Sequence, residues 1–306
     1  MLKAYSMRGF AISFWAMAVF LAVPTAARGA GRVVVLKSSA ISLYSQALSG
    51  FRKGFRGAVE EHDLGGDEGK GRRILESMKD SPPDVIVAIG AKAAIAARQT
   101  MPEVAMVYSL VVNPKRIGIQ GPNVAGVAHV ISPGDQFAHL KKLAPRVKRI
   151  GVVHHRSSNA TIREGQKGAL AHGLALVARE VKKREDVPQA LSALLAKVDA
   201  VWLIADLVVV TQESFEYLLT KSFEAKLPIL AYSKAFVKGG ALVALSPDYV
   251  GIGVAVAGLA NDIVAQGTVT AREVPPPGEL FVNSVTATRL GLGLPPDLRA
   301  RARILP

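Results

Sequence analysis

Two patterns of apolar residues alternate along this chain from residue 32 onward. Short unbroken apolar runs, bounded by glycine or proline, are typical of strands buried on both faces of a parallel sheet. Longer stretches in which apolar residues recur every three or four positions are typical of helices with one buried face. The clearest strand is Val85–Ile89, between Pro82-Pro83-Asp84 and Gly90, and residues 91–99 after it favour a helix.

The same two patterns predict the remaining elements. We expect strands at residues 32–37, 61–64, 85–89, 104–108, 124–130, 149–153, 175–181, 200–204, 228–232, 241–246 and 280–283. We expect helices at residues 44–59, 69–79, 91–99, 135–143, 161–172, 187–195, 211–223, 249–265 and 284–290, with a short one after Ser233.

Strands that alternate with helices in two successive series predict an α/β protein with two doubly wound, Rossmann-like lobes. We assign residues 28–130 plus 247–276 to the N-terminal lobe and 131–246 plus 277–306 to the C-terminal lobe. The pieces after residue 246 are too small for a domain of their own, so the chain should cross a multi-strand hinge near 131, 246 and 276. Ligands of such sheets collect at the carboxyl ends of the strands, which here predicts a cleft between the lobes.

The first 27 residues have the features of an export signal. Lys3 and Arg8 precede an apolar core at residues 11–23, and small residues follow. This pattern predicts a Sec-type signal peptide cleaved after Ala27. The alternative is an uncleaved transmembrane anchor, but an apolar core of about 13 residues is shorter than the ~20 that span a bilayer.

Composition narrows the class of protein further. The chain has 306 residues, of which 50% are hydrophobic, and no cysteine, so it has neither disulfides nor a cysteine for lipid attachment. We therefore expect a soluble, non-lipidated periplasmic protein.

The net charge is +14, or +12 once Lys3 and Arg8 are removed. Its basic residues are scattered in small groups without interleaved aromatics, which indicates a solvated surface and no nucleic-acid partner.

Several residues are candidates for ligand contact because they follow predicted strands. The junction at Gly90 presents free backbone N–H groups and a helix dipole, which suit a carboxylate. Asp206 follows a buried strand and needs a partner, either a ligand cation or, alternatively, a neighbouring turn or lysine. The other candidates at strand ends are Ser38, Ser39, Tyr44, Ala91, Lys92, Tyr232 and Ser233.

Catalytic and metal-binding patterns are weak in this sequence. His154-His155 raises the possibility of a metal site, but adjacent residues on extended backbone point to opposite faces and no third ligand has matching spacing. No Gly-x-Ser-x-Gly elbow or phosphate-binding loop is present. We expect no metal, no cofactor and no enzymatic activity.

A set of short motifs, in order, resembles one family. The motifs are Pro-Asp-Val-Ile-Val-Ala-Ile-Gly at 83–90, Asn113-Pro114, Gly-Pro-Asn-Val-Ala-Gly-Val at 121–127, Leu-Ala-Pro at 143–145, Lys-Arg-Ile-Gly-Val at 148–152, Val-Asp-Ala-Val-Trp at 198–202, Gly-Gly-Ala-Leu at 239–242, Val282-Asn283 and Leu-Gly-Leu at 290–292. Together they resemble the ABC-transporter substrate-binding proteins that include tryptophan and tyrosine binders, which have a type I periplasmic-binding-protein fold.

The resemblance implies a monomeric receptor that closes over a small solute and delivers it to a membrane permease with a separate ATPase subunit. It implies that Ser38, Ser39, Gly90, Ala91 and Asn113 hold a ligand carboxylate, and that Asp206 holds an ammonium group. Lys92 and the pair His155-Arg156 depart from the family pattern, and their charge favours an additional anionic group on the ligand. Two alternatives stay open: a sensory module that signals to a membrane receptor, and a hydrolase or transferase.

Overall fold

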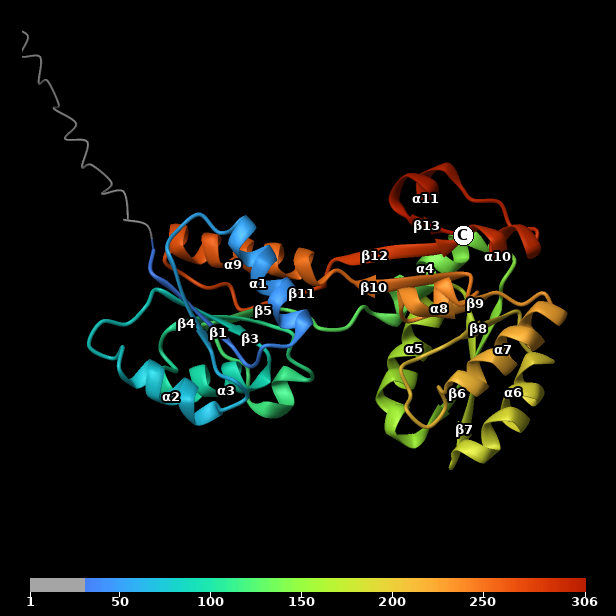
Figure 1. Cartoon of the computed structure of the whole chain (residues 1–306), viewed down its shortest axis with the longest axis horizontal. Helices are drawn as coiled ribbons and strands as arrows, with labels where there is room; N and C mark the ends of the chain where they lie inside the picture. The colour runs from blue at the N-terminus through green and yellow to red at the C-terminus, as the bar shows by residue number, and fades with distance from the viewer. Residues whose placement is uncertain (1–30) are drawn as a thin grey trace, which may run out of the picture.

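The computed structural model describes residues 31–306, and these form two α/β lobes, each built on its own twisted sheet (Figure 1). The predicted fold class is confirmed. The predicted signal peptide, residues 1–27, lies outside the described residues.

The sheet of the N-terminal lobe has six parallel strands in the order β11-β5-β4-β3-β1-β2. These strands are β1 (Val33–Lys37), β2 (Val59–Asp63), β3 (Val85–Ile89), β4 (Ala105–Ser109), β5 (Val124–Val127) and β11 (Glu273–Val274). The helices of this lobe are α1 (Ser42–Gly54), α2 (Glu68–Glu76), α3 (Ala91–Thr100), α9 (Tyr249–Gln266) and the 3-10 helix η1 (Pro114–Ile117).

Both faces of this sheet are covered, which is why its central strands are apolar throughout. Successive strand residues point to opposite faces, so Val33 and Val35 pack with α1 and α9, whereas Val34 and Leu36 pack with α2 and α3. The strand that was clearest in the sequence, β3, lies between β1 and β4 and is buried along its whole length.

The C-terminal lobe has a seven-stranded sheet in the order β13-β12-β10-β9-β8-β6-β7, in which β12 runs antiparallel to β10. Its strands are β6 (Arg149–His155), β7 (Ala175–Val181), β8 (Ala200–Trp202), β9 (Ile229–Ala231), β10 (Val243–Pro247), β12 (Gly278–Asn283) and β13 (Arg303–Leu305). Its helices are α4 (Pro133–Leu143), α5 (Asn159–Ala171), α6 (Val187–Leu195), α7 (Gln212–Glu224), α8 (Lys234–Lys238), α10 (Ser284–Arg289), α11 (Pro296–Arg301), η2 (Arg156–Ser158) and η3 (Arg184–Asp186).

Two apolar clusters stabilise this second lobe, one on each face of the sheet. Helices α4 and α5 cover one face, where the rings of Phe137 and Trp202 pack edge to face with their centroids 4.9 Å apart. Helices α6, α7 and α8 cover the other face. Thr211 caps α7, because its side chain accepts a hydrogen bond from the backbone N–H of Ser214 at 3.1 Å.

Three segments connect the lobes: β5 to α4, β10 to α9, and β11 to β12 (Figure 1). Two of these segments are tied together, since the backbone N–H of Asp248 donates to the carbonyl of Pro277 at 2.9 Å. The Asp248 side chain also caps α9 by accepting from the N–H of Gly251 at 2.9 Å. The connection is therefore a bundle of backbone segments rather than a single flexible linker.

Among the described helices, α9 is the one whose length and apolar character would allow it to cross a membrane. In this fold it is a core helix, because its residues Ile252, Val256 and Ile263 are buried against the N-terminal sheet and α1. Helices α1 and α9 approach closely where glycines face each other's backbone, at Gly50 and Gly253.

Several predicted elements were wrong in their extent, among them the helix predicted at 69–79, which ends at Glu76, and the strand predicted at 200–204, which ends at Trp202. The helix predicted at 44–59 ends at Gly54, and Val59 begins β2, two residues before the predicted strand. The sequence of β2 is mostly polar because this edge strand pairs on one side only and is half-buried along its length. The strand predicted at 124–130 ends at Val127, where the chain enters the hinge. Two elements near the C-terminus, α11 and β13, were not predicted.

Candidate functional site

Three of the predicted N-terminal contact residues converge at the carboxyl ends of β1 and β3. Gly90 has a φ of +92°, a conformation that glycine adopts freely and other residues avoid. A Cβ atom at this position would lie 2.7 Å from the Ser38 Oγ and 2.7 Å from the Tyr44 phenol oxygen. Ser38 is buried, and its Oγ accepts a hydrogen bond from the backbone N–H of Ala93 at 3.0 Å. A hydroxyl cluster therefore surrounds the start of α3.

The tight fit at Gly90 leads to a prediction. Gly90→Ala should lower the free energy of unfolding by about 2 kcal/mol, because it combines a strained φ with a steric clash against Ser38 and Tyr44. Urea unfolding followed by circular dichroism measures this change. Gly65→Ala is the matched control, because its φ is also positive (+61°) but no atom lies within 4 Å of the added Cβ. Equal losses in the two variants would contradict a specific clash at Gly90.

The other predicted residues of this lobe lie at the same edge in different settings. Ser39 and Ala91 are half-buried. Lys92 is exposed, and its Nζ donates to the carbonyl oxygen of Gly66. Asn113 is exposed with a φ of +50° and precedes η1.

The sequence interpretation missed Ser109, which ends β4 beside this cluster. Ser109 is fully buried, and its carbonyl accepts a hydrogen bond from the N–H of Gly90 at 2.9 Å. Its hydroxyl has no partner among the residues that the structure describes. The available signal was a serine at the end of an apolar strand, the same signal that identified Ser38.

In the C-terminal lobe, Asp206 is the centre of a hydrogen-bonded loop. One carboxylate oxygen accepts from the N–H of His155 at 2.8 Å and from the hydroxyl of Ser158 at 2.7 Å. The other accepts from the backbone N–H groups of Val208 at 3.0 Å and Val209 at 3.2 Å. These four bonds occupy about as many lone-pair sites as a carboxylate has.

Asp206 is 3% exposed, and burial opposes its ionisation, but the hydrogen bonds from Ser158 and the three backbone N–H groups outweigh this effect and hold its pKa below the usual value. In this conformation the carboxylate stabilises the turn that follows β8, which matches the alternative role considered from the sequence. A direct bond to a ligand ammonium group stays a prediction.

His155 and Arg156, beside this loop, are more accessible to solvent than Asp206 is. The imidazole of His155 is half-buried, and its Nδ1 lies 2.9 Å from the Ser157 Oγ, while Arg156 is exposed. His154 is buried and points its Nδ1 toward the carbonyl of His155 at 3.2 Å. Across residues 31–306 no group of three or more His, Asp or Glu side chains is arranged to hold a metal ion.

A cavity of about 680 Å³ lies where the two lobes meet the hinge. The C-terminal lobe contributes Tyr232 and Ser233, both predicted from the sequence, and Ala205, which precedes Asp206. The cavity is also lined by residues of the N-terminal lobe and the hinge that were not predicted: Gln46, His129, Val130, Ile131, Ser246, Pro247, Asp248, Tyr249 and Val250. They come from two of the hinge crossings and from helices α1 and α9, which only the tertiary fold brings together.

The cavity has polar groups on an otherwise apolar wall. Tyr232 packs against Phe236 with ring centroids 4.9 Å apart, and burial raises the pKa of its phenol. Burial lowers the pKa of His129, whose Nδ1 has no partner among the described residues. A cavity with a few polar groups in a mostly apolar lining, at a boundary between lobes, has the character of a small-molecule site.

The chain belongs to the ABC transporter substrate-binding protein family, whose model matches residues 50–304. Its two lobes have the type I periplasmic-binding-protein fold. Among individual relatives, a tyrosine-binding protein from Clostridioides difficile is 24% identical over 224 residues, which cover 70% of this chain and 64% of that protein. The alignment thus spans less than two thirds of the relative's own length.

Solved structures share this architecture. The ligand-free, open structure of a substrate-binding protein with adhesive properties from Clostridium difficile is 20% identical, with a TM-score of 0.73, covering 90% of this chain and 99% of that one. An ABC domain in complex with L-Trp from Streptococcus pneumonia has the same identity and coverage, with a TM-score of 0.54.

Proposed function

We propose that this protein captures a small polar, amino-acid-like or anionic solute outside the cytoplasm and delivers it unchanged to an ABC importer. The observation that carries this proposal is the cavity between the lobes, whose walls come from both lobes and the hinge. A ligand bound there contacts both halves of the protein at once, so it favours a closed arrangement of the lobes over an open one.

Two sets of side chains support an amino-acid-like ligand. The N-terminal set, at the start of α3, offers backbone N–H groups and the hydroxyls of Ser38 and Tyr44 to a carboxylate. Tyr232 and Ser233 offer an aromatic face and a hydroxyl from the opposite lobe. Relatives described as a tyrosine-binding protein and as a complex with L-Trp make these two amino acids the first ligands to test.

The further predicted contacts belong to the same proposal. Ser39, Gly90, Ala91 and Asn113 would line the carboxylate end of the site, and Lys92, His155 and Arg156 would favour an additional anionic group. Asp206 would act on the ligand through the loop that it holds, unless closure of the lobes releases one of its four hydrogen bonds.

The proposed cellular role rests on the predicted signal peptide and on the family to which the chain belongs. We propose export through a Sec signal ending at Ala27, a soluble monomer in the periplasm, and transfer of solute to a membrane permease with a separate ATPase subunit. The residues of the cavity serve binding rather than turnover.

Ligand-induced thermal stabilisation tests the proposal. Purified mature protein should unfold several degrees higher with L-tyrosine, L-tryptophan or another amino acid at about 100 times its Kd, because binding to the folded state alone adds about 2.7 kcal/mol. Ser233→Ala should reduce this shift with little effect on the unliganded protein, because the Ser233 side chain makes no capping bond.

Ser49→Ala is the matched control, since Ser49 is exposed on α1 and lies outside the cavity. A panel of amino acids and small carboxylates that produces no shift, or a bound solute that is chemically converted by the pure protein, would overturn the proposal.

A further inference from the structure

A second cavity, of about 650 Å³, lies at the other end of the C-terminal sheet. Its lining residues Val147, Asp199 and Pro228 stand just before β6, β8 and β9, whereas Ala205 and Tyr232 of the interlobe cavity stand just after β8 and β9. Because these strands are parallel, the second cavity, here called the distal pocket, lies at their amino ends and the interlobe cavity lies at their carboxyl ends. A ligand in the distal pocket cannot bridge the lobes.

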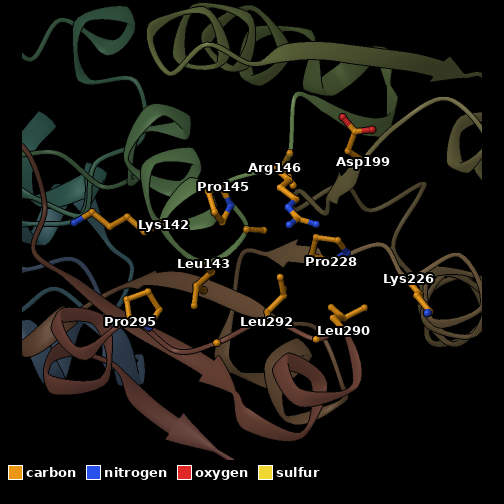
Figure 2. A pocket seen from close by; sticks show the side chains of 14 residues that line it. Lys142, Leu143, Pro145, Arg146, Asp199, Lys226, Pro228, Leu290, Leu292 and Pro295 are labelled. Carbon is orange, nitrogen blue, oxygen red and sulfur yellow. The ribbon is translucent and has the colours of Figure 1, made fainter.

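The wall of the distal pocket has about as much polar as apolar surface, and leucine and proline side chains form its apolar part. Leu143 is buried in the core, and Leu290 and Leu292 pack against the same core cluster. Pro145 and Pro228 complete the wall (Figure 2). This apolar part of the wall favours a ligand with an apolar body.

One cationic side chain, that of Arg146, extends toward the apolar part of the wall. In Figure 2 the guanidinium of Arg146 projects toward Pro228 and Leu292, whereas the amino groups of Lys142 and Lys226 point away from the centre. Lys142 is already paired with Asp297 at 3.7 Å. Arg146 makes no hydrogen bond or ion pair with any residue in the range 31–306, so its planar array of N–H donors is open to a ligand.

The one acidic residue in the lining, Asp199, does not neutralise this cation. Its carboxylate accepts from the backbone N–H groups of Lys148 at 3.0 Å and Arg149 at 2.8 Å, and pairs with the Arg149 guanidinium at 3.0 Å. Burial acts against ionisation, but these bonds outweigh it and lower the pKa of Asp199. In Figure 2 its oxygens point away from Arg146.

Lys226, at the rim of the distal pocket, has an unusual backbone conformation. It has a φ of +54° and closes α7, with its N–H bonded to Phe223 and the next N–H, of Leu227, bonded to Ser222 at 2.8 Å. This left-handed position after a helix is usually occupied by glycine. The chain thus keeps a long cationic side chain at the pocket rim against the local conformational preference.

We propose that the distal pocket binds a small monocarboxylate with an apolar body, with Arg146 as its carboxylate partner. A guanidinium matches the geometry of a carboxylate by two parallel hydrogen bonds, and the leucines and prolines receive the rest of the molecule. Of the three cationic residues in the lining, Arg146 is the one that points toward the apolar part of the wall, and one guanidinium favours a monoanion over a phosphate, which needs more donors. This site is independent of the interlobe cavity.

Benzoate is the probe for the test, with benzamide as its neutral, equally shaped counterpart. Methyl NMR of the mature protein should show saturable shifts at Leu290 and Leu292 with a Kd of about 1 mM or better. Benzamide should bind at least about tenfold more weakly. Arg146→Gln should weaken benzoate by about tenfold or more, and Arg146→Lys, which keeps the charge without the planar fork, by less.

Arg163→Gln is the matched control, because Arg163 is an exposed arginine of α5 outside the pocket. Its benzoate affinity and the thermal midpoint of all variants should equal those of the parent. Unchanged binding in Arg146→Gln, equal binding of benzamide, shifts confined to Leu245 and Val250 of the interlobe cavity, or no saturable shift would each overturn the proposal. Because the two cavities report through different methyl groups, failure here is distinguishable from failure of the proposed function.

Discussion

Replacing Gly253 with alanine is expected to lower the free energy of unfolding by about 3 kcal/mol or more. The added Cβ would lie 1.9 Å from the carbonyl oxygen of Ala47 and 2.6 Å from the backbone nitrogen of Phe51. Both atoms belong to the backbone of α1, so no side-chain rotation relieves the clash. The two helices have to separate, which loosens the apolar cluster that they share with the N-terminal sheet.

Gly258→Ala provides the matched control for this experiment. Gly258 lies in the same helix, is exposed, and has no atom within 4 Å of the position of an added Cβ. This variant should raise the free energy of unfolding by about 0.5–1 kcal/mol, because alanine loses less backbone entropy than glycine in a helix. Urea unfolding followed by circular dichroism measures both variants. Similar effects of the same sign would show that the close approach of α1 and α9 does not determine stability.

Asp206→Ala is expected to lower the free energy of unfolding by about 3 kcal/mol, because it removes a buried carboxylate and leaves its donors without a partner. The donors are the N–H groups of His155, Val208 and Val209 and the hydroxyl of Ser158. Asp206→Asn keeps the shape and one acceptor oxygen, so it should lose less. Glu213→Ala is the control at an exposed acid of α7 and should change stability by less than about 0.5 kcal/mol.

The Asp206 prediction also has a pH dependence. The pKa of this carboxyl is lowered in the folded protein, so its contribution is fully present above the unfolded pKa of about 3.9 and is lost as the pH falls through the folded value. The stability difference between the parent and Asp206→Asn should therefore shrink on acidification below about pH 4. A difference that stays constant across this range would show that the carboxylate charge contributes nothing.

Much of the fold was predictable because its strands are buried on both faces. The run Val85–Ile89 is apolar and clearly bounded, so the strand observed as β3 begins and ends where predicted. The predicted bounds of the edge strand β2 were poor, because its side chains are only half-buried and its sequence therefore has no apolar run. The short strand β13 pairs with β12 at its carboxyl end, a contact about twenty residues distant in sequence that no local pattern reports.

The candidate site was predictable only where it follows strand ends. Tyr232 and Ser233, predicted because they follow a buried strand, line the interlobe cavity, whereas Ser38 and Gly90 lie at strand ends outside its lining. Contact of any of them with a ligand stays a prediction. Gln46, His129 and Tyr249 were missed, since they come from α1, from the hinge crossing before α4 and from the start of α9. Their proximity depends on the angle at which the lobes meet.

By itself, the sequence determined the alternation of strands and helices, and with it an α/β protein in two lobes, because strands buried on both faces are unbroken apolar runs and helices with one buried face have an apolar residue every three or four positions. The tertiary structure alone decided what individual polar groups do. It committed the four acceptor positions of Asp206 to its own loop, and it left the guanidinium of Arg146 without a partner among the described residues, beside the leucines and prolines of the distal pocket. The groups that pair with a charged side chain are those that lie near it in space, and the spacing of residues along the chain does not reveal which groups these are.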